Sequence, residues 1–187
     1  MNTFIVATLQ FASDLRKAGR FAVGMNNARC EDAANDQRRL FAPLKAAEKK
    51  FDFLKFLASH GISHSDYVVG KVAYILTLAG CLPQMEHTDY KAGKWNFHPR
   101  PPLNVLIALT EREYVVCPSS HLLHDSFKDA VPITVALNPG DVIVTCGDVL
   151  HHGGGNKLLT DAFALHAYID NPTLPNGKHS ANSIHVP

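Results

Sequence analysis

The sequence predicts a mainly β protein with helices at its N-terminal end, built around an antiparallel sandwich or barrel. Two observations indicate this fold class. Apolar residues recur at helical spacing in the first 60 residues, and short β-rich runs separated by turn residues follow Gly61. No helix-length segment is predicted between these runs. Because parallel strands need long crossovers, antiparallel pairing is expected.

The helical signal is strongest from Leu40 onward. The apolar positions there are spaced by three or four residues, and they are Leu40, Leu44, Ala47, Phe51, Leu54 and Ala58. Lysines occupy the other faces, as expected for the solvated side of a packing helix. Gly61 is placed to end this helix in a left-handed cap.

Seven β-rich runs follow this helix. They are 67–79, 83–89, 103–110, 113–117, 133–137, 141–146 and 162–169. Asn138, Pro139 and Gly140 predict a turn between two of them, because Pro presets φ and Gly tolerates positive φ. The segment 91–102 is rich in Gly and Pro, which predicts a loop at the mouth of a barrel.

The chain length of 187 residues suits one domain with a sizeable core. We therefore predict a single domain over 1–187. It comprises a helical N-terminal scaffold (1–61), a β core (62–170) and a turn-rich tail (171–187).

Composition and charge exclude several classes of protein. Hydrophobic residues make up 46% of the chain and charged residues 19%, which excludes a disordered or fibrous protein. Lys and Arg number 18 against 17 Asp and Glu, so no overall field favours nucleic acid or an acidic membrane. The four cysteines have no metal or redox spacing, which predicts free thiols in a reducing compartment. The first residues lack a secretory pattern, and a cytoplasmic location is predicted.

The triplet His87-Thr88-Asp89 is the first feature that predicts chemistry. Residues i and i+2 of a strand point to the same face, so the imidazole and the carboxylate can hold one metal ion together. A third ligand is expected after the strand 141–146, where His151 follows a turn containing Gly147 and Asp148. His152 is the alternative for this third position, and the spacing Gly-Asp-x-x-His favours His151.

Two histidines and one carboxylate form the facial triad of non-haem iron(II) oxygenases. This arrangement leaves coordination positions open for a co-substrate and for O₂. Zinc hydrolysis is an alternative for the same ligand set. His87, Asp89 and His151 are thus the expected metal-binding and catalytic residues.

The order of five short motifs resembles a known family. The motifs are Pro83-Gln84-x-x-His87-Thr88-Asp89-Tyr90, Pro118-Ser119-Ser120-His121, Pro139-Gly140-Asp141, Gly147-Asp148-x-x-His151 and Leu165-His166-Ala167-Tyr168. From about Leu82 to Ile169, the sequence resembles the iron(II)/2-oxoglutarate-dependent dioxygenases, in the branch similar to phytanoyl-CoA dioxygenase. This resemblance implies a double-stranded β-helix, also described as a jelly-roll or cupin-like barrel. It also implies Fe(II), with 2-oxoglutarate and O₂ as co-substrates, and hydroxylation of a C–H bond.

The chain departs from this family at one position. The family usually carries an Arg on the strand after the distal histidine, where its guanidinium pairs with the 5-carboxylate of 2-oxoglutarate. Here Ala164 stands at that position, and the sequence contains no Arg after Arg112. His166 and Lys157 are candidate replacements for the positive charge, and Asn104 and Tyr74 are candidate hydrogen-bonding residues for the co-substrate.

Two other functions therefore stay open beside the 2-oxoglutarate-dependent enzyme. A cupin-like metal enzyme that does not use 2-oxoglutarate would explain the missing Arg. A non-catalytic binding protein on the same barrel is the second alternative, and the complete triad makes it the less favoured. The expected substrate is a small molecule, with a peptide side chain or a nucleobase as other possibilities.

Overall fold

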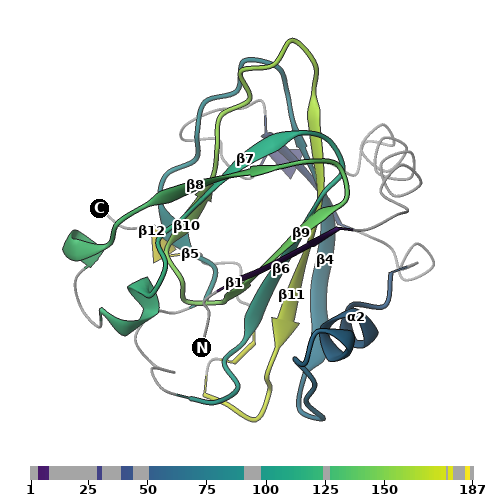
Figure 1. The fold of residues 1–187 in the computed structure, drawn as a ribbon, viewed down its shortest axis with the longest axis vertical. Helices are drawn as coiled ribbons and strands as arrows, with labels where there is room; N and C mark the ends of the chain where they lie inside the picture. The colour runs from purple at the N-terminus through teal and green to yellow at the C-terminus, as the bar shows by residue number, and fades with distance from the viewer. Residues whose placement is uncertain are drawn as a thin grey trace.

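Two antiparallel sheets packed face to face form the fold (Figure 1). The computed structural model describes residues 4–8, 29–30, 39–43, 51–90, 98–123, 127–175, 177–178 and 184–185. The larger sheet has the order β1 (Phe4–Thr8), β9 (Asp141–Cys146), β6 (Leu103–Ala108), β11 (Ala162–Asp170), β4 (Val68–Thr77), β3 (Arg39–Pro43) and β2 (Arg29–Cys30). The smaller sheet has the order β12 (Ile184–His185), β5 (His87–Thr88), β10 (His151–Gly153), β7 (Arg112–Val116) and β8 (Ile133–Leu137). The helix α2 (Phe53–Ser59) and two short 3₁₀ helices, η3 (Ser120–Leu122) and η4 (Phe127–Asp129), complete the described elements.

The predicted mainly β, antiparallel architecture is confirmed. Every described strand pair is antiparallel, and the runs predicted at 133–137 and 141–146 coincide with β8 and β9. The run predicted at 83–89 is shorter in the structure, where only His87 and Thr88 form β5. The structure also contains β10, a strand that the sequence pattern did not predict.

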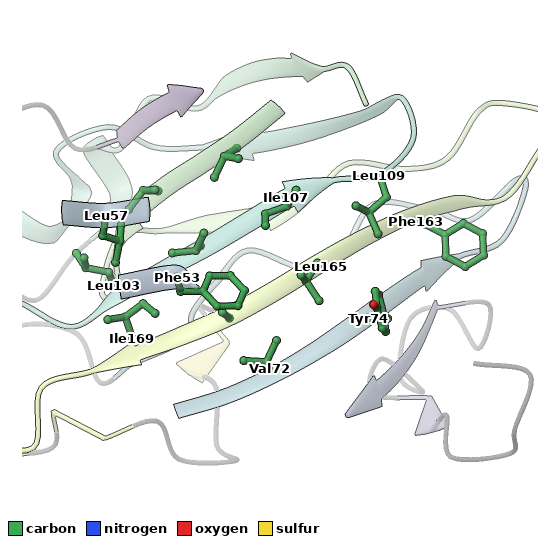
Figure 2. Packing of buried hydrophobic residues seen from close by; sticks show 14 of the residues in the cluster. Phe53, Leu57, Val72, Tyr74, Leu103, Ile107, Leu109, Phe163, Leu165 and Ile169 are labelled. Atoms are coloured by element: carbon green, nitrogen blue, oxygen red, sulfur yellow. The ribbon is translucent and has the colours of Figure 1, made fainter. Parts of the chain in front are cut away.

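The two faces of the larger sheet bury different sets of residues. Its outer face packs against α2 and forms the outer core, part of which is shown in Figure 2. The outer core consists of Phe53, Leu57, Tyr67, Val72, Tyr74, Leu76, Leu103, Val105, Ile107, Leu109, Val142, Val144, Phe163, Leu165, Ala167 and Ile169. Its inner face packs against the smaller sheet and forms the inner core: Leu106, Ala108, Tyr114, Val116, Leu137, Ile143, Val149 and Ala164.

Strand parity decides which residues reach the space between the sheets. On β11, Leu165 and Ala167 belong to the outer core, whereas Ala164 belongs to the inner core. Side chains two residues apart share a face, so His166 points inward with Ala164. The inner face of β11 therefore presents a histidine among apolar neighbours.

The prediction of a helical scaffold over residues 1–61 is wrong for the described residues before position 44. Three strands lie in this region, and the helix predicted from Leu40 is reduced to α2. Pro43 supplies a physical reason, because proline lacks the N–H of a helix interior and disfavours helix at the residue before it. β3 instead pairs with β4, in the register Leu40 to Leu76, and β1 pairs with β9. The segment 44–50 lies outside the described residues.

Two predicted backbone features are confirmed at glycines. Gly61 has φ +76°, and its N–H donates to the Ala58 carbonyl just after α2, as expected for a left-handed helix cap. Gly140 has φ +98°, and the Asp141 N–H donates to the Asn138 carbonyl across the predicted turn.

The tail from 171 to 187 contains more than turns. Turns occupy the described residues after Asp170, but Ile184 and His185 form β12, which pairs with β5. The backbone of Ile184 and His185 thus lies beside the strand that carries His87. Within the described ranges, no helix has the length and apolar character needed to cross a membrane.

Replacement of Leu57 by Ala tests the outer core. Leu57 is almost fully buried against the larger sheet, so Leu57→Ala should lower the free energy of unfolding by about 2–5 kcal/mol. Leu54→Ala on the same helix is the matched control, because Leu54 is 37% exposed and should cost much less. Urea unfolding followed by circular dichroism measures both, and equal effects would contradict this packing of α2.

Candidate metal centre

His87 and Asp89 lie together at the end of β5, as their spacing predicts. Both residues are buried, and His87 Nε2 lies 3.8 Å from Asp89 Oδ1. The side chain of Thr88 between them is also buried, and its hydroxyl donates to the Tyr90 carbonyl at 2.8 Å. This local hydrogen bond stabilises the turn immediately after the His-x-Asp triplet.

His151 completes a group of three possible ligands through backbone pairing. It begins β10, and its register partner on β5 is His87. The His151 Nε2 atom lies 3.2 Å from Asp89 Oδ2, and the two imidazole centroids are 4.7 Å apart. One ligand atom from each of His87, Asp89 and His151 falls within 4.8 Å of the others. The structure therefore brings the three predicted ligands together, in a geometry that could hold a metal ion.

The hydrogen bonds of the two rings determine which nitrogen faces Asp89. Each Nδ1 lies 2.8 Å from the backbone carbonyl two residues earlier, Met85 for His87 and Val149 for His151. A carbonyl oxygen only accepts, so Nδ1 carries the proton, and in a neutral ring Nε2 is left with its lone pair. Two Nε2 lone pairs then converge on a buried carboxylate, an arrangement that requires a shared cation or a proton. The donor set and its burial thus fit a divalent metal.

Electrostatics at the site favours the ionised carboxylate. Burial raises the pKa of Asp89, but His151, His166 and His87 act in the opposite direction and hold that pKa below its ordinary value. For His151, burial lowers the pKa, but Asp89 and the Val149 carbonyl raise it. The net result is an increase in the pKa of His151. Asp89 and His151 therefore stabilise each other's charged forms.

His152 does not join this group. Neighbouring residues of a strand point to opposite faces, and His152 is half-buried, with its Nδ1 3.1 Å from the Gly153 carbonyl. Of the two candidates for the third metal ligand, the structure places His151 beside Asp89.

His166 lies nearer to the triad than expected of a residue that binds the far end of a co-substrate. Its Nε2 atom is 3.8 Å from Asp89 Oδ2, the same separation as between His87 Nε2 and Oδ1. Tyr168 packs edge-on to the His166 ring, with centroids 4.6 Å apart. Three imidazoles therefore lie beside the Asp89 carboxylate, and the group that could hold a metal ion comprises His87, Asp89 and His151.

The other candidate co-substrate residues lie in three different places. Asn104 is buried on the inner face of β6, and within the described chain neither its amide nitrogen nor its amide oxygen has a hydrogen-bond partner. Tyr74 lies in the outer core (Figure 2), and its hydrogen bond to the co-substrate stays a prediction. β4 is apolar on both faces, and the register pairs Tyr74 with Leu165 rather than with His166. Lys157 is exposed in the loop before β11 and lines a cavity at that end of the fold.

Gly147 in the Gly-Asp-x-x-His motif has a steric role. A Cβ atom on Gly147 would overlap the ring of Tyr90, which follows Asp89 directly. The Tyr90 N–H donates to the Gly147 carbonyl at 3.1 Å, and the Tyr90 hydroxyl donates to Asp170 Oδ1 at 2.7 Å. The close approach fixes the turn that precedes β10 against the turn that follows β5.

The Pro-Ser-Ser-His motif supports the segment before His151. The Ser120 side chain is fully buried, and its Oγ accepts a hydrogen bond from the Leu150 N–H at 2.8 Å. The Cys117 N–H donates to the Leu150 carbonyl at 2.9 Å. The motif therefore orients the backbone of Leu150, immediately before the histidine. Sequence spacing alone did not predict this role.

Comparison with known proteins finds likeness in structure alone. No protein-family model and no curated protein sequence matches the chain. The non-haem α-ketoglutarate-dependent epimerase SnoN from nogalamycin biosynthesis aligns with a TM-score of 0.69 at 16% identity, over 90% of this chain and 77% of SnoN. The carbocyclase SnoK from the same biosynthesis aligns at 0.67 and 16%, over 96% and 89%. EctD from S. alaskensis with bound Fe aligns at 0.64 and 14%, over 95% and 76%. The chain thus has the fold of these proteins.

Substitution of Gly147 by Ala tests the contact with Tyr90. The added methyl group displaces the Tyr90 ring, and we expect Gly147→Ala to lower the free energy of unfolding by about 1–3 kcal/mol and to weaken cobalt(II) binding. The double variant with Tyr90→Val should recover part of the loss, because the smaller side chain leaves room for the methyl group. Purely additive losses in urea unfolding would contradict the steric explanation.

Asp148 gives a prediction about pH. Its side chain is buried, and among the described residues neither carboxylate oxygen has a hydrogen-bond partner outside its own backbone. Burial raises the pKa of Asp148 to about 6. Between the unfolded pKa near 4 and this value the folded state binds more protons, so this group makes the protein less stable as pH rises.

Asp148→Asn removes this titration. The variant should exceed the parent protein in free energy of unfolding by up to about 3 kcal/mol above pH 6, and the difference should shrink as pH falls toward 4. Urea unfolding of metal-free protein at several pH values measures the difference. A difference that is constant with pH would show that folding does not shift the pKa of Asp148.

Proposed function

We propose that this protein is a non-haem iron(II) oxygenase that uses 2-oxoglutarate and O₂ to hydroxylate a C–H bond, most simply in a small molecule. The observation that carries the proposal is the buried group of His87, Asp89 and His151, with both Nε2 atoms directed at one carboxylate between two antiparallel sheets. We further propose that these sheets are a double-stranded β-helix within a single cytoplasmic domain.

Each ligand has a separate role in holding the metal. His87 and His151 would donate Nε2 lone pairs, and the Met85 and Val149 carbonyls keep their rings in the required tautomer. Asp89 would supply the single negative charge, which offsets half of the charge of iron(II). When bound, iron(II) supplies the redox chemistry that couples decarboxylation of 2-oxoglutarate to C–H oxidation.

The surrounding residues restrict water and orient the ligands. Tyr114 is buried and stacks on the His151 ring, with centroids 5.5 Å apart and planes inclined by 20°. Val149 and Val116 flank the same histidine and are fully buried. A low local dielectric strengthens the attraction between Asp89 and a bound cation.

The names of the structural neighbours support a 2-oxoglutarate-dependent reaction without specifying its outcome. SnoN is described as an epimerase and SnoK as a carbocyclase, both dependent on α-ketoglutarate. Hydroxylation is our proposal for this chain, and the same metal centre is compatible with other outcomes of C–H oxidation.

A metal enzyme that does not use 2-oxoglutarate is the second candidate. One observation favours it: Ala164, which occupies the place expected for an anchoring Arg, is fully buried in the inner core. His166 also places a third imidazole beside Asp89, which is one more than a triad of two histidines and one carboxylate requires.

Anaerobic titration separates these functions. Purified protein with iron(II) should develop the metal-to-ligand absorption band when 2-oxoglutarate is added, and should release succinate after O₂ is admitted. His87→Ala and Asp89→Ala should abolish iron binding, because each removes a ligand from a triad. His152→Ala is the control and should bind iron normally. An iron-loaded protein without the band at millimolar 2-oxoglutarate supports the second candidate, and a band without succinate supports a binding protein.

A further inference from the structure

Arg112 introduces a cation into the space between the sheets from the strand β7. Tyr114 and Val116 on β7 belong to the inner core, and Arg112 shares their face because it lies two residues before Tyr114. The Nε and Nη1 atoms of Arg112 are buried. A guanidinium is always charged and its planar fork matches a carboxylate in two parallel hydrogen bonds.

Arg112 lines a cavity of about 390 Å³ at the end of the fold where β4 ends and β11 begins. Thr77, Ala162 and Lys157 line the same cavity. This is the end at which an anchoring Arg on β11 was expected. The chain therefore brings a guanidinium to that end from the opposite sheet.

Tyr114 lies between Arg112 and the triad on the inner face of β7. Tyr114 stacks on His151 and follows Arg112 on the same face of β7. A single side chain therefore lies between Arg112 and the His151 ring along this face.

The spacing along β11 suits a five-carbon dicarboxylate. Ala162, in the cavity, lies four positions before His166, beside Asp89, which is about 13 Å of strand. The Arg112 side chain covers part of this separation. Between the two levels, the inward-facing pair Ala164 and Ala108 is in register across β11 and β6, and small side chains leave room for a methylene chain.

We infer that Arg112 binds the distal carboxylate of the 2-oxo dicarboxylate co-substrate, in place of the Arg that is absent from β11. This inference rests on the proposed function. Lys157, although it lines the same cavity, is exposed and is not required for this binding. Arg112 is a binding residue that sequence reasoning missed.

Ligands with and without a distal carboxylate test the inference. Calorimetry on anaerobic iron(II)-loaded protein compares 2-oxoglutarate with 2-oxovalerate, which has the same chain length and no second carboxylate. The parent protein should bind 2-oxoglutarate about 100-fold more tightly, as expected for a charge-assisted bidentate pair. Arg112→Gln should lose most of this preference and bind 2-oxovalerate as the parent does, whereas Arg112→Lys should retain part of it. Lys157→Gln, the matched control, should retain the full preference.

The outcomes separate this inference from the proposed function. If the iron-loaded parent protein binds neither ligand, the proposed function fails and the inference fails with it. If the parent prefers 2-oxoglutarate and Arg112→Gln keeps that preference, only the role of Arg112 is overturned. Loss of the preference in Lys157→Gln would also overturn it and identify Lys157 as the anchor. Iron content and thermal unfolding establish that each variant is folded, and Arg112→Lys gives the same test if Arg112→Gln is unstable.

Discussion

Convergence of imidazole nitrogens on the Asp89 carboxylate is the constraint on which the site depends. A buried carboxylate is costly unless cations or donors surround it, and here three rings approach it from β5, β10 and β11. β5 and β10 are hydrogen-bonded neighbours in one sheet, and β11 belongs to the other. The packing of the two sheets and the geometry of the centre are therefore coupled, so displacement of either sheet would alter the distances at Asp89.

The motifs around the ligands act mainly on the backbone. Gly147 admits the Tyr90 ring, and Ser120 binds the Leu150 N–H. Gln84 exchanges two hydrogen bonds with Gly153, its N–H donating to the Gly153 carbonyl and its Oε1 accepting from the Gly153 N–H. Each of these contacts joins a turn or strand that carries a ligand to a neighbouring segment. Rings that are oriented by backbone carbonyls need such rigid support, because a small shift of the carbonyl rotates the ring.

The sequence was sufficient for several core strands and for the grouping of His87, Asp89 and His151, but not for the N-terminal strands or for residues that meet across the fold. β8 and β9 were predicted to the residue because turn residues bound them, and the His-x-Asp spacing follows directly from strand parity. β4 and β11 are apolar on both faces, so the pattern could not show that Tyr74 faces the outer core. The proximity of His166 to Asp89 and the cavity that Arg112 lines depend on how the two sheets pack, which no local pattern encodes. The N-terminal strands were missed because their pairing partners, β4 and β9, are distant in sequence.

Pairing of β1 with β9 has a consequence for the solution behaviour of the protein. β1 is the edge strand of the larger sheet and covers β9, the next strand. The central residues of β9, Val142, Ile143 and Val144, are buried. Without the first eight residues, β9 would present an unprotected row of backbone donors and acceptors along an apolar strand. Such an edge is a template for intermolecular pairing. The pairing of β1 with β9 thus protects β9 against aggregation. The inner face of β9 lies among the side chains between the two sheets.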